Sequence, residues 1–286
     1  MRAWSKSLPA CAVCAVAAGV VAFLWVVPLF SRWSAGWSQE PPSAIAPPVA
    51  TAPADPAADY TVAWQDEPRE FTEARRRMIR QEMAARDIDD PVVLRAIGRV
   101  PRQQFVPAEL RQAAYADQPL PIGEGQTISQ PYIVALMTQL AGAKPGGRAL
   151  DIGTGSGYQA AVLAEICQEV YSIEILEPLA NQAKKLLASL GYKNITVRHG
   201  DGYRGWEENA PFDVIIVAAA AGHVPQPLVD QLAKGGKLVI PVGQWRQELL
   251  VIERDQEGKV HRRSGIPVRF VPMTGEVEKT GAARGR

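Results

Sequence analysis

The chain is poor in cysteine and histidine, which many metal and redox enzymes use. It has three cysteines and three histidines among 286 residues. Cys11 and Cys14 lie in an apolar segment and Cys167 lies in a core region, so their spacing gives neither a disulfide framework nor a zinc site. We expect no metal centre. His199 and His223 are isolated, and we expect both to be structural.

Charge of one sign is not in excess either. The 31 basic and 30 acidic residues leave a net charge of +1, which argues against a dedicated nucleic-acid binder. The motif H-E-x-x-H, a nucleophile elbow and a phosphate loop ending in G-K-[ST] are all missing. The sequence N-P-P-Y, typical of enzymes that methylate exocyclic amines or amides, is missing too, and four alanines stand in its place at 218–221.

One long uncharged run is present, from residue 7 to residue 31, after Arg2 and Lys6. Its length suits a membrane span better than the core of a signal peptide. We therefore expect a signal or anchor segment at 1–33, with membrane contact through 7–31. Residues 34–68 are rich in proline and alanine and predict a disordered linker. A catalytic domain at 69–278 and a disordered tail at 279–286 complete the expected organisation.

The part of the chain from residue 148 onward alternates between apolar strands and helices. We expect strands at 149–152, 170–174, 195–197, 212–218 and 237–242, a closing pair at 249–253 and 268–272, and helices at 158–166, 179–190 and 224–232. Helices at 71–88, 91–99 and 131–140 precede them. This alternation predicts an α/β fold with a doubly wound, mostly parallel sheet and N-terminal helices.

A glycine turn follows the first of these strands. Gly153, Gly155 and Gly157 form G-x-G-x-G, with Thr154 and Ser156 between them. The third glycine comes one residue earlier than in the dinucleotide motif G-x-G-x-x-G. Asp151 at the strand end would repel a pyrophosphate and suit an ammonium group. We therefore expect S-adenosylmethionine as the cofactor, the alternative being a turn that binds nothing.

Two more acids stand at strand ends, where ligands bind in such sheets. Glu174 comes about twenty residues after the turn, the spacing at which an acid bonds ribose hydroxyls. Asp201, followed by Gly202, could accept a hydrogen bond from an adenine amino group. Without the glycine turn, Glu174 would be an ordinary surface acid and Asp201 an ordinary turn residue.

Residues 123–132 are polar and lead into the helix expected at Pro131. Either they only cap that helix, or they bind a carboxylate at its N-terminus. The missing general base favours a carboxylate acceptor, because a carboxylate is already ionised and needs only positioning in a dry site.

From about residue 71 to residue 275 the sequence resembles the protein-L-isoaspartate (D-aspartate) O-methyltransferase family. The carrying segments are Val-Pro-Arg at 100–102, Phe-Val-Pro at 105–107, Pro-Leu-Pro-Ile-Gly at 119–123, Gly-Gln-Thr-Ile-Ser-Gln-Pro at 125–131, the segment 151–158 and Val-Arg-Phe-Val-Pro at 268–272. The Thr-Ile-Ser segment is highly specific to that family, whereas the glycine turn is shared by many methyltransferases.

The resemblance implies a Rossmann-like methyltransferase fold. It also implies methyl transfer from S-adenosylmethionine to the α-carboxyl of L-isoaspartyl residues, which starts the repair of damaged proteins through a succinimide. It places the active-site serine at Ser129 and substrate contacts at Thr127, Ile128 and Gln130. Cofactor contacts fall on Asp151, Gly153, Thr154, Gly155, Ser156, Gly157, Glu174, Asp201 and Gly202.

Other readings stay open. The chain could methylate another carboxylate or a small molecule, or it could be an inactive, membrane-tethered binding module. The family is usually cytosolic and lacks a hydrophobic leader, and the cofactor is made in the cytoplasm. We therefore expect a cytoplasmic, monomeric catalytic domain, the alternative being membrane-anchored or periplasmic.

Overall fold

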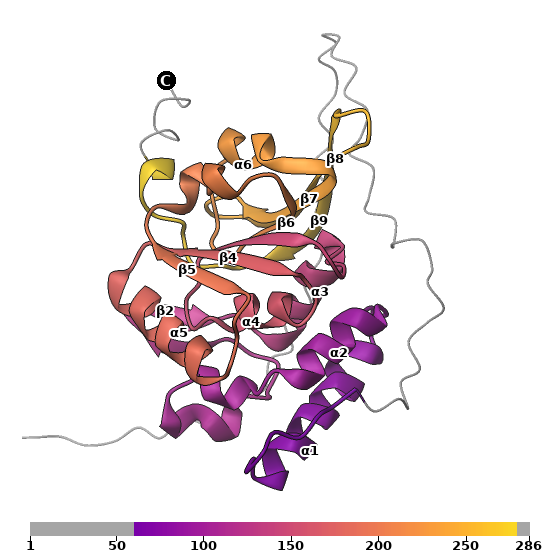
Figure 1. Cartoon of the computed structure of the whole chain (residues 1–286), viewed down its shortest axis with the longest axis vertical. Helices are drawn as coiled ribbons and strands as arrows, with labels where there is room; N and C mark the ends of the chain where they lie inside the picture. The colour runs from indigo at the N-terminus through magenta and orange to yellow at the C-terminus, as the bar shows by residue number, and fades with distance from the viewer. Residues whose placement is uncertain (1–59, 279–286) are drawn as a thin grey trace, which may run out of the picture. The chain divides into compact units, whose positions relative to one another are not determined.

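The computed structural model describes residues 60–278. A seven-stranded sheet with the order β5-β4-β3-β6-β7-β8-β9 forms its centre (Figure 1). The strands are β3 (Arg148–Ile152), β4 (Glu169–Glu174), β5 (Ile195–His199), β6 (Phe212–Val217), β7 (Leu232–Val242), β8 (Gln247–Arg254) and β9 (Val260–Val268). Strands β3 to β7 pair in parallel, and β8 and β9 are antiparallel additions. The prediction of a doubly wound, mostly parallel sheet is confirmed.

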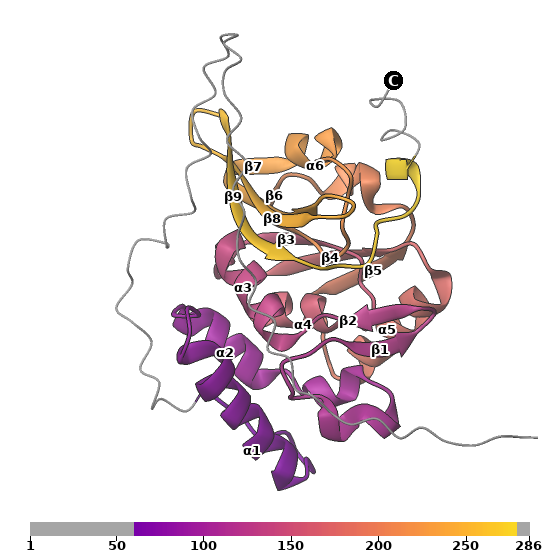
Figure 2. The same ribbon diagram turned by 180° about the vertical axis from the view of Figure 1, so that it is seen from behind.

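Helices cover both faces of the sheet. Helices α3 (Pro131–Ala141), α4 (Tyr158–Ala164) and α5 (Glu177–Ser189) lie on one face and α6 (Gln226–Asp230) on the other (Figure 2). Strand β6 is apolar from Val214 to Val217. Val214 and Ile216 enter the core under α3 and α4, while Ile215 and Val217 enter the core under α6. Where a strand is covered on both faces, its side chains are apolar.

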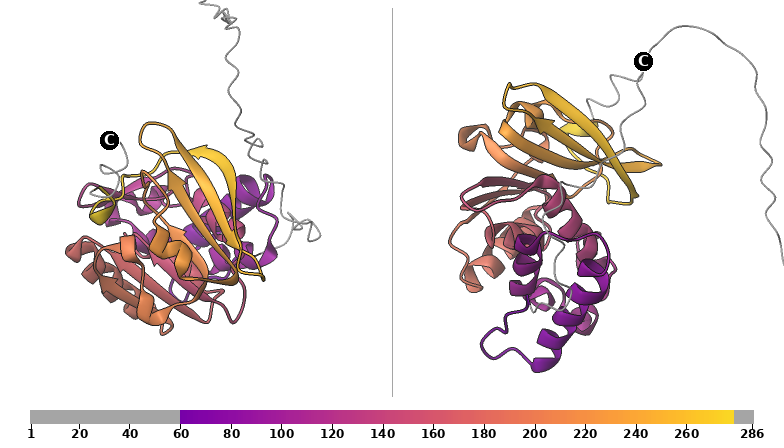
Figure 3. Two further views of the ribbon diagram at one scale, coloured as in Figure 1. Left: turned by 90° about the horizontal axis from the view of Figure 1, so that it is seen from above. Right: turned by 90° about the vertical axis from the view of Figure 1, so that its right-hand side faces the viewer.

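The N-terminal helices form a further layer outside α3 and α4, visible at the lower end of the second view in Figure 3. Helix α2 (Pro91–Arg99) begins as expected, with Asp90 accepting a hydrogen bond from the Val92 N–H at 2.8 Å. The single helix expected at 71–88 is instead α1 (Arg69–Met78), followed by a π-helical segment, η1 (Ile79–Ala84). Within η1 both Ile79 and Met83 are buried.

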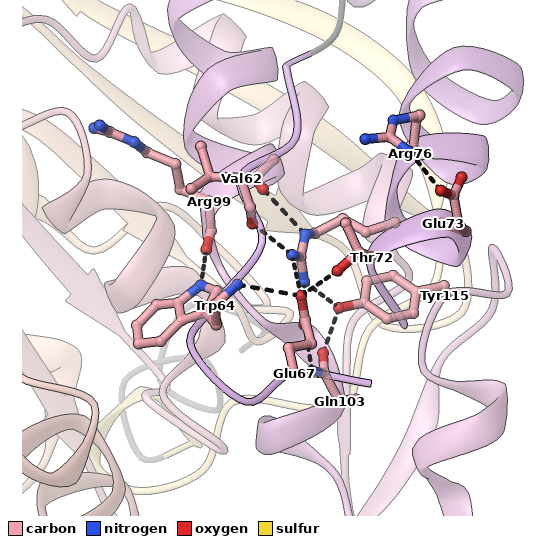
Figure 4. A network of polar contacts seen from close by, with 11 residues as sticks. Val62, Trp64, Glu67, Thr72, Glu73, Arg76, Arg99, Gln103 and Tyr115 are labelled. Atoms are coloured by element: carbon pink, nitrogen blue, oxygen red, sulfur yellow. Dashed lines mark hydrogen bonds and ion pairs between the residues drawn. The ribbon is translucent and has the colours of Figure 1, made fainter. Parts of the chain in front are cut away.

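Residues 60–67, which we expected in the linker, pack against this layer. The Val62 N–H donates to the Gly98 carbonyl at 3.1 Å. Glu67 is buried, and its carboxylate accepts hydrogen bonds from Arg75, Thr72 and Gln103. Figure 4 shows Glu67, Thr72 and Gln103 close together. Residues before 69 therefore take part in the packing of the described domain.

A two-stranded hairpin and short 3-10 helices connect the layers. Strands β1 (Leu120–Gly123) and β2 (Gln126–Ile128) are antiparallel, and the turn between them has positive φ from Gly123 to Gly125. We expected only an irregular loop there, since strands this short give no alternation to recognise. The 3-10 helices are η2 (Arg102–Phe105), η3 (Ala108–Ala113), η4 (Gly202–Arg204) and η5 (Glu207–Asn209).

The prediction of a C-terminal strand at 268–272 is wrong. The edge strand β9 is Val260–Val268, whose two arginines and histidine hid it because an edge strand tolerates charge on its exposed face. Residues 271–273 instead lie beside Ala220, just past the end of β6. The Ala220 N–H donates to the Val271 carbonyl and the Met273 N–H donates to the Ala220 carbonyl, both at 2.8 Å. Helix α6 is shorter than expected because Leu232 already belongs to β7.

Within residues 60–278, no helix combines the length and apolarity that a bilayer span requires. The expected signal or anchor segment at 1–33, most of the linker and the tail at 279–286 lie outside the described residues.

Candidate active site

A cavity of about 230 Å³ opens where the strand order reverses, between the carboxyl ends of β3 and β6. The segment after β3 leads toward β4, and the segment after β6 leads toward β7 on the other side. The two segments diverge and leave a crevice between them. Gly153 follows β3 and Ala218 follows β6, and both line the cavity. The fold therefore opens a cavity beside the predicted glycine turn.

The glycine turn forms the floor of this cavity. Gly153, Thr154, Gly155 and Ser156 line it. Gly155 has φ of +52°, and its N–H points at the Glu174 carboxylate, 2.8 Å away. Gly157 does not reach the cavity. Its φ of +89° and an added Cβ only 3.2 Å from Leu187 show that this glycine serves the close packing of α4 on α5.

Glu174 closes the turn from the neighbouring strand. Its side chain is 5% exposed and also accepts a hydrogen bond from the Leu176 N–H at 3.0 Å. Each carboxylate oxygen thus bonds one backbone N–H and keeps a further lone pair. Glu174 lines the cavity and can accept hydrogen bonds from a ligand.

Asp151 lies behind the turn, and it does not line the cavity. It is fully buried, and Ser172 donates a hydrogen bond to its Oδ2 at 2.7 Å. The Ser172 hydroxyl is in turn 2.5 Å from Thr154 Oγ1. Burial raises the pKa of Asp151 to about 7, opposed by the Ser172 bond and assisted by the Glu174 charge. Its other oxygen, Oδ1, is buried and has no hydrogen-bond partner among the described residues, and the expected contact with an ammonium group stays a prediction.

Asp201 also turns away from the cavity, although Gly202 lines it. The Asp201 carboxylate accepts hydrogen bonds from the Tyr203 N–H at 2.9 Å and the Glu276 N–H at 2.7 Å. It thereby anchors residues 271–276, which we call the C-terminal strap. Residues 271–274 of this strap line the cavity.

The end of β2 and the residue that follows it form another part of the cavity wall. Thr127, Ile128 and Ser129 line the cavity, and Gln130 lines an adjoining groove of about 830 Å³. Five residues line both, so the two spaces adjoin along Thr127, Ser129, Ala218, Val271 and Pro272. Asp117 holds the start of α3, since it accepts hydrogen bonds from the Tyr132 N–H and the Gln130 amide.

The cavity and the groove carry opposite charges. Within the described residues, the ionisable groups of the cavity wall are two acids, Glu124 and Glu174, and a tyrosine, with no base. No acid lines the groove, and its two bases are Arg269 and Arg86, of which Arg86 pairs with Asp117 at 3.3 Å just outside the lining. The cavity therefore favours a cationic ligand and the groove an anionic one. Neither His199 nor His223 lines either space.

Comparison with known proteins agrees with this geometry. The sequence profile of the protein-L-isoaspartate(D-aspartate) O-methyltransferase family matches residues 73–278. The chain belongs to this family. The family prediction made from the motifs is confirmed.

Curated relatives of the family match over most of their length. A protein-L-isoaspartate O-methyltransferase 2 of Polaromonas is 56% identical over 189 residues, which is 65% of this chain and 90% of the relative. The Opitutus terrae enzyme is 55% identical over 209 residues, covering 73% and 90%. A Plasmodium falciparum homologue, crystallised with S-adenosyl-L-homocysteine, superposes with a TM-score of 0.61 at 28% identity, covering 71% of this chain and 98% of that one.

The motif analysis missed several residues that the fold brings to the family site. Ala218 and Ala219 after β6, Tyr158 at the start of α4, and the strap at 271–274 all line the cavity. The groove adds Arg86 and Arg269. The run of small residues at 218–221, directly after an apolar strand, could have indicated a close approach by a ligand. Arg269 lies in the Val-Arg-Phe-Val-Pro segment that carries the resemblance, but nothing in the sequence indicated that it would share a groove with Arg86, which comes from the opposite end of the domain.

Proposed function

We propose that this protein transfers a methyl group from S-adenosylmethionine to the α-carboxyl of L-isoaspartyl residues in damaged proteins. The next peptide nitrogen then attacks the methyl ester, methanol leaves and a succinimide forms, and hydrolysis of that ring begins the repair. The observation that best supports this proposal is that an acidic cavity adjoins a basic groove, and that Thr127 and Ser129 line both. A cationic methyl donor and an anionic acceptor would occupy the two sides of this junction.

The residues of the cavity fit S-adenosylmethionine. Glu174 would bond the ribose hydroxyls, Gly153, Thr154, Gly155 and Ser156 would lie under the ligand, and Gly202 and the strap would flank its adenine. The wall has no cationic group within the described residues, as a sulfonium ligand requires. When bound there, the cofactor supplies an electrophilic methyl group.

The acceptor side needs binding and orientation more than proton transfer. An isoaspartyl carboxylate is ionised at neutral pH. The hydroxyls of Ser129 and Thr127 and the nearby backbone N–H groups would hold one carboxylate oxygen toward the methyl group. Met137, Ile152 and Val271 in the cavity wall would keep water away from the reacting atoms. Alignment of two bound reactants accounts for most of the rate in such a site.

A labelled-methyl assay tests the proposal. The purified protein is incubated with methyl-labelled S-adenosylmethionine and either an isoaspartyl peptide or the same peptide with a normal aspartyl bond. We expect base-labile methyl esters on the first peptide only, followed by succinimide formation. Equal labelling of both peptides, or labelling only of small carboxylic acids, would contradict the proposed acceptor.

We further propose that catalysis takes place in the cytoplasm and that the enzyme is a monomer. The cytoplasm is where S-adenosylmethionine is made. Cell fractionation together with the mass of the mature N-terminus tests the first statement, and light scattering on the purified protein tests the second. A periplasmic or membrane-bound pool as the main fraction would overturn the cytoplasmic assignment.

A further inference from the structure

Two arginines of the domain are fully buried, and they differ in how their charge is balanced. Arg75 forms a bidentate pair with Glu67, both bonds being 2.8 Å, and also bonds Tyr115 at 2.7 Å. Arg102 bonds only two backbone carbonyls, those of Ala114 and Ser129, both at 2.7 Å. Within the described residues, no carboxylate lies within ion-pair distance of Arg102. One buried cation is thus neutralised and the other is not.

An unpaired buried cation works against folding. Removing a charge from water is costly unless an opposite charge compensates, and an apolar side chain of similar volume usually serves stability better. Burial accordingly lowers the pKa of Arg102. Nη1 of Arg102 also lacks a hydrogen-bond partner of normal geometry within residues 60–278. The two carbonyl bonds and the Tyr158 ring therefore compensate this buried charge only in part.

The contacts of Arg102 lead to both sides of the site. Its Nη2 donates to the carbonyl of Ser129, which lines the cavity and the groove. Its guanidinium carbon lies 4.7 Å from the ring centre of Tyr158, the first residue of α4 after the glycine turn and part of the cavity wall. Arg102 itself lines neither space, so it acts through these neighbours.

The bond to Ser129 fixes a peptide group. In a trans peptide the C=O and N–H bonds point in opposite directions, so the Gln130 N–H points away from Arg102. That N–H makes no hydrogen bond to another described residue, and Gln130 lines the groove. A charged donor on the carbonyl polarises the peptide and strengthens the N–H as a donor. The charge of Arg102 can therefore reach an acceptor carboxylate through the Ser129–Gln130 peptide.

We propose that Arg102 is a positioning residue for the acceptor carboxylate. It holds the Ser129 carbonyl, directs the Gln130 N–H toward the groove, and keeps this segment in register with α4 beside the cofactor. This role rests on the proposed function. It predicts that Arg102 contributes to binding and alignment of the isoaspartyl peptide and little to cofactor affinity.

The test compares Arg102→Met and Arg102→Lys with the double variant Glu67→Gln/Arg75→Met, which removes the other buried arginine together with its partner. We expect Arg102→Met to raise the peptide KM roughly tenfold or more and to lower kcat, as loss of a charge-assisted bond implies. Cofactor-product affinity by calorimetry should change less than about threefold. Arg102→Lys should give intermediate values, and added guanidinium ion should partly restore Arg102→Met. The double variant should lower the melting temperature and leave kcat/KM unchanged.

A second measurement separates this proposal from the proposed function. Binding of the isoaspartyl peptide to the complex with S-adenosylhomocysteine is followed by calorimetry, without turnover. Weaker peptide binding by Arg102→Met, beside normal binding by the double variant, supports the positioning role even where turnover is undetectable. Unchanged peptide binding and kcat/KM in a folded Arg102→Met would overturn it. So would parallel losses of cofactor affinity and melting temperature, or failure of both Arg102 variants to fold. A wild-type protein that neither methylates nor binds the peptide would overturn the proposed function itself.

Discussion

The Glu174 carboxylate accepts a hydrogen bond from the Gly155 N–H at 2.8 Å, joining the end of β4 to the glycine turn after β3. The acid thus shapes the turn and also faces the cavity. We expect Glu174→Ala to raise the cofactor KM about tenfold or more, since one to two hydrogen bonds to the ribose are lost. Calorimetry with S-adenosylhomocysteine measures the same loss directly. An unchanged affinity would remove Glu174 from the site.

Ser129 stands where the cavity and the groove meet. Ser129→Ala removes a hydroxyl donor to a charged acceptor, and we expect kcat/KM for an isoaspartyl peptide to fall about 10-fold to 100-fold. Ser189→Ala, on the exposed side of α5, is the matched control and should leave kcat/KM unchanged. Full turnover by Ser129→Ala would exclude the serine from catalysis.

Asp201 holds the C-terminal strap through its hydrogen bond with the Glu276 N–H. Two variants separate this role from direct contact with adenine. Asp201→Ala frees the Tyr203 and Glu276 N–H groups, so cofactor affinity and melting temperature should both fall. Gly275→Ala keeps the acid but displaces the strap, because an added Cβ would lie 2.5 Å from Asp201 Oδ2 at a φ of +99°. We expect both variants to weaken cofactor binding. If only Asp201→Ala does so, the carboxylate acts on the ligand directly.

The exposed pair between Arg204 and Glu276 also joins the strap to η4, with its shorter contact at 2.7 Å. Exposed ion pairs contribute about 0–1 kcal/mol. Arg204→Ala is therefore the control for the strap experiments and should leave cofactor affinity nearly unchanged.

Asp151 predicts a pH dependence of stability. Its pKa is about 7 in the folded protein against an ordinary value of 3.8. A carboxyl that holds its proton more tightly when folded gives a stability contribution that is complete below about pH 4 and is lost as the pH rises to about 7. The loss is at most on the order of 4 kcal/mol. Asp151→Asn keeps an acceptor for Ser172 and has no proton to release, so its urea unfolding should change less between pH 5 and 8. Identical pH profiles would contradict a buried, protonatable Asp151.

Glu67 and Arg75 form a buried ion pair, so we expect the loss of one partner to lower the free energy of unfolding. Burial raises the pKa of Glu67, but the hydrogen bonds from Arg75 and Thr72 outweigh it and leave the pKa below its usual value. Glu67→Gln leaves the buried Arg75 charge without its carboxylate and should destabilise the domain by about 3–5 kcal/mol. Glu67→Gln/Arg75→Met should be less destabilised than Glu67→Gln in urea unfolding. A larger loss in the double variant would show that packing of the Arg75 side chain dominates.

The sequence by itself determined the parallel sheet, the glycine turn and the position of Glu174. Each is a local pattern: an apolar strand, glycines at fixed spacing, and an acid at a strand end. The Thr-Ile-Ser segment, singled out by resemblance, lines the cavity. These features depend on residues close together in the chain, and their outcome in the fold follows from strand and helix geometry.

Only the tertiary structure decided which acids face the ligand and which charges surround it. Asp151 and Asp201 stand at strand ends as Glu174 does, yet one bonds Ser172 inside the sheet and the other anchors the strap. Arg86 and Arg269 meet in one groove although 183 positions separate them. The orientation of a side chain and the charge of a cavity depend on contacts between distant segments, and such contacts exist only once the chain has folded.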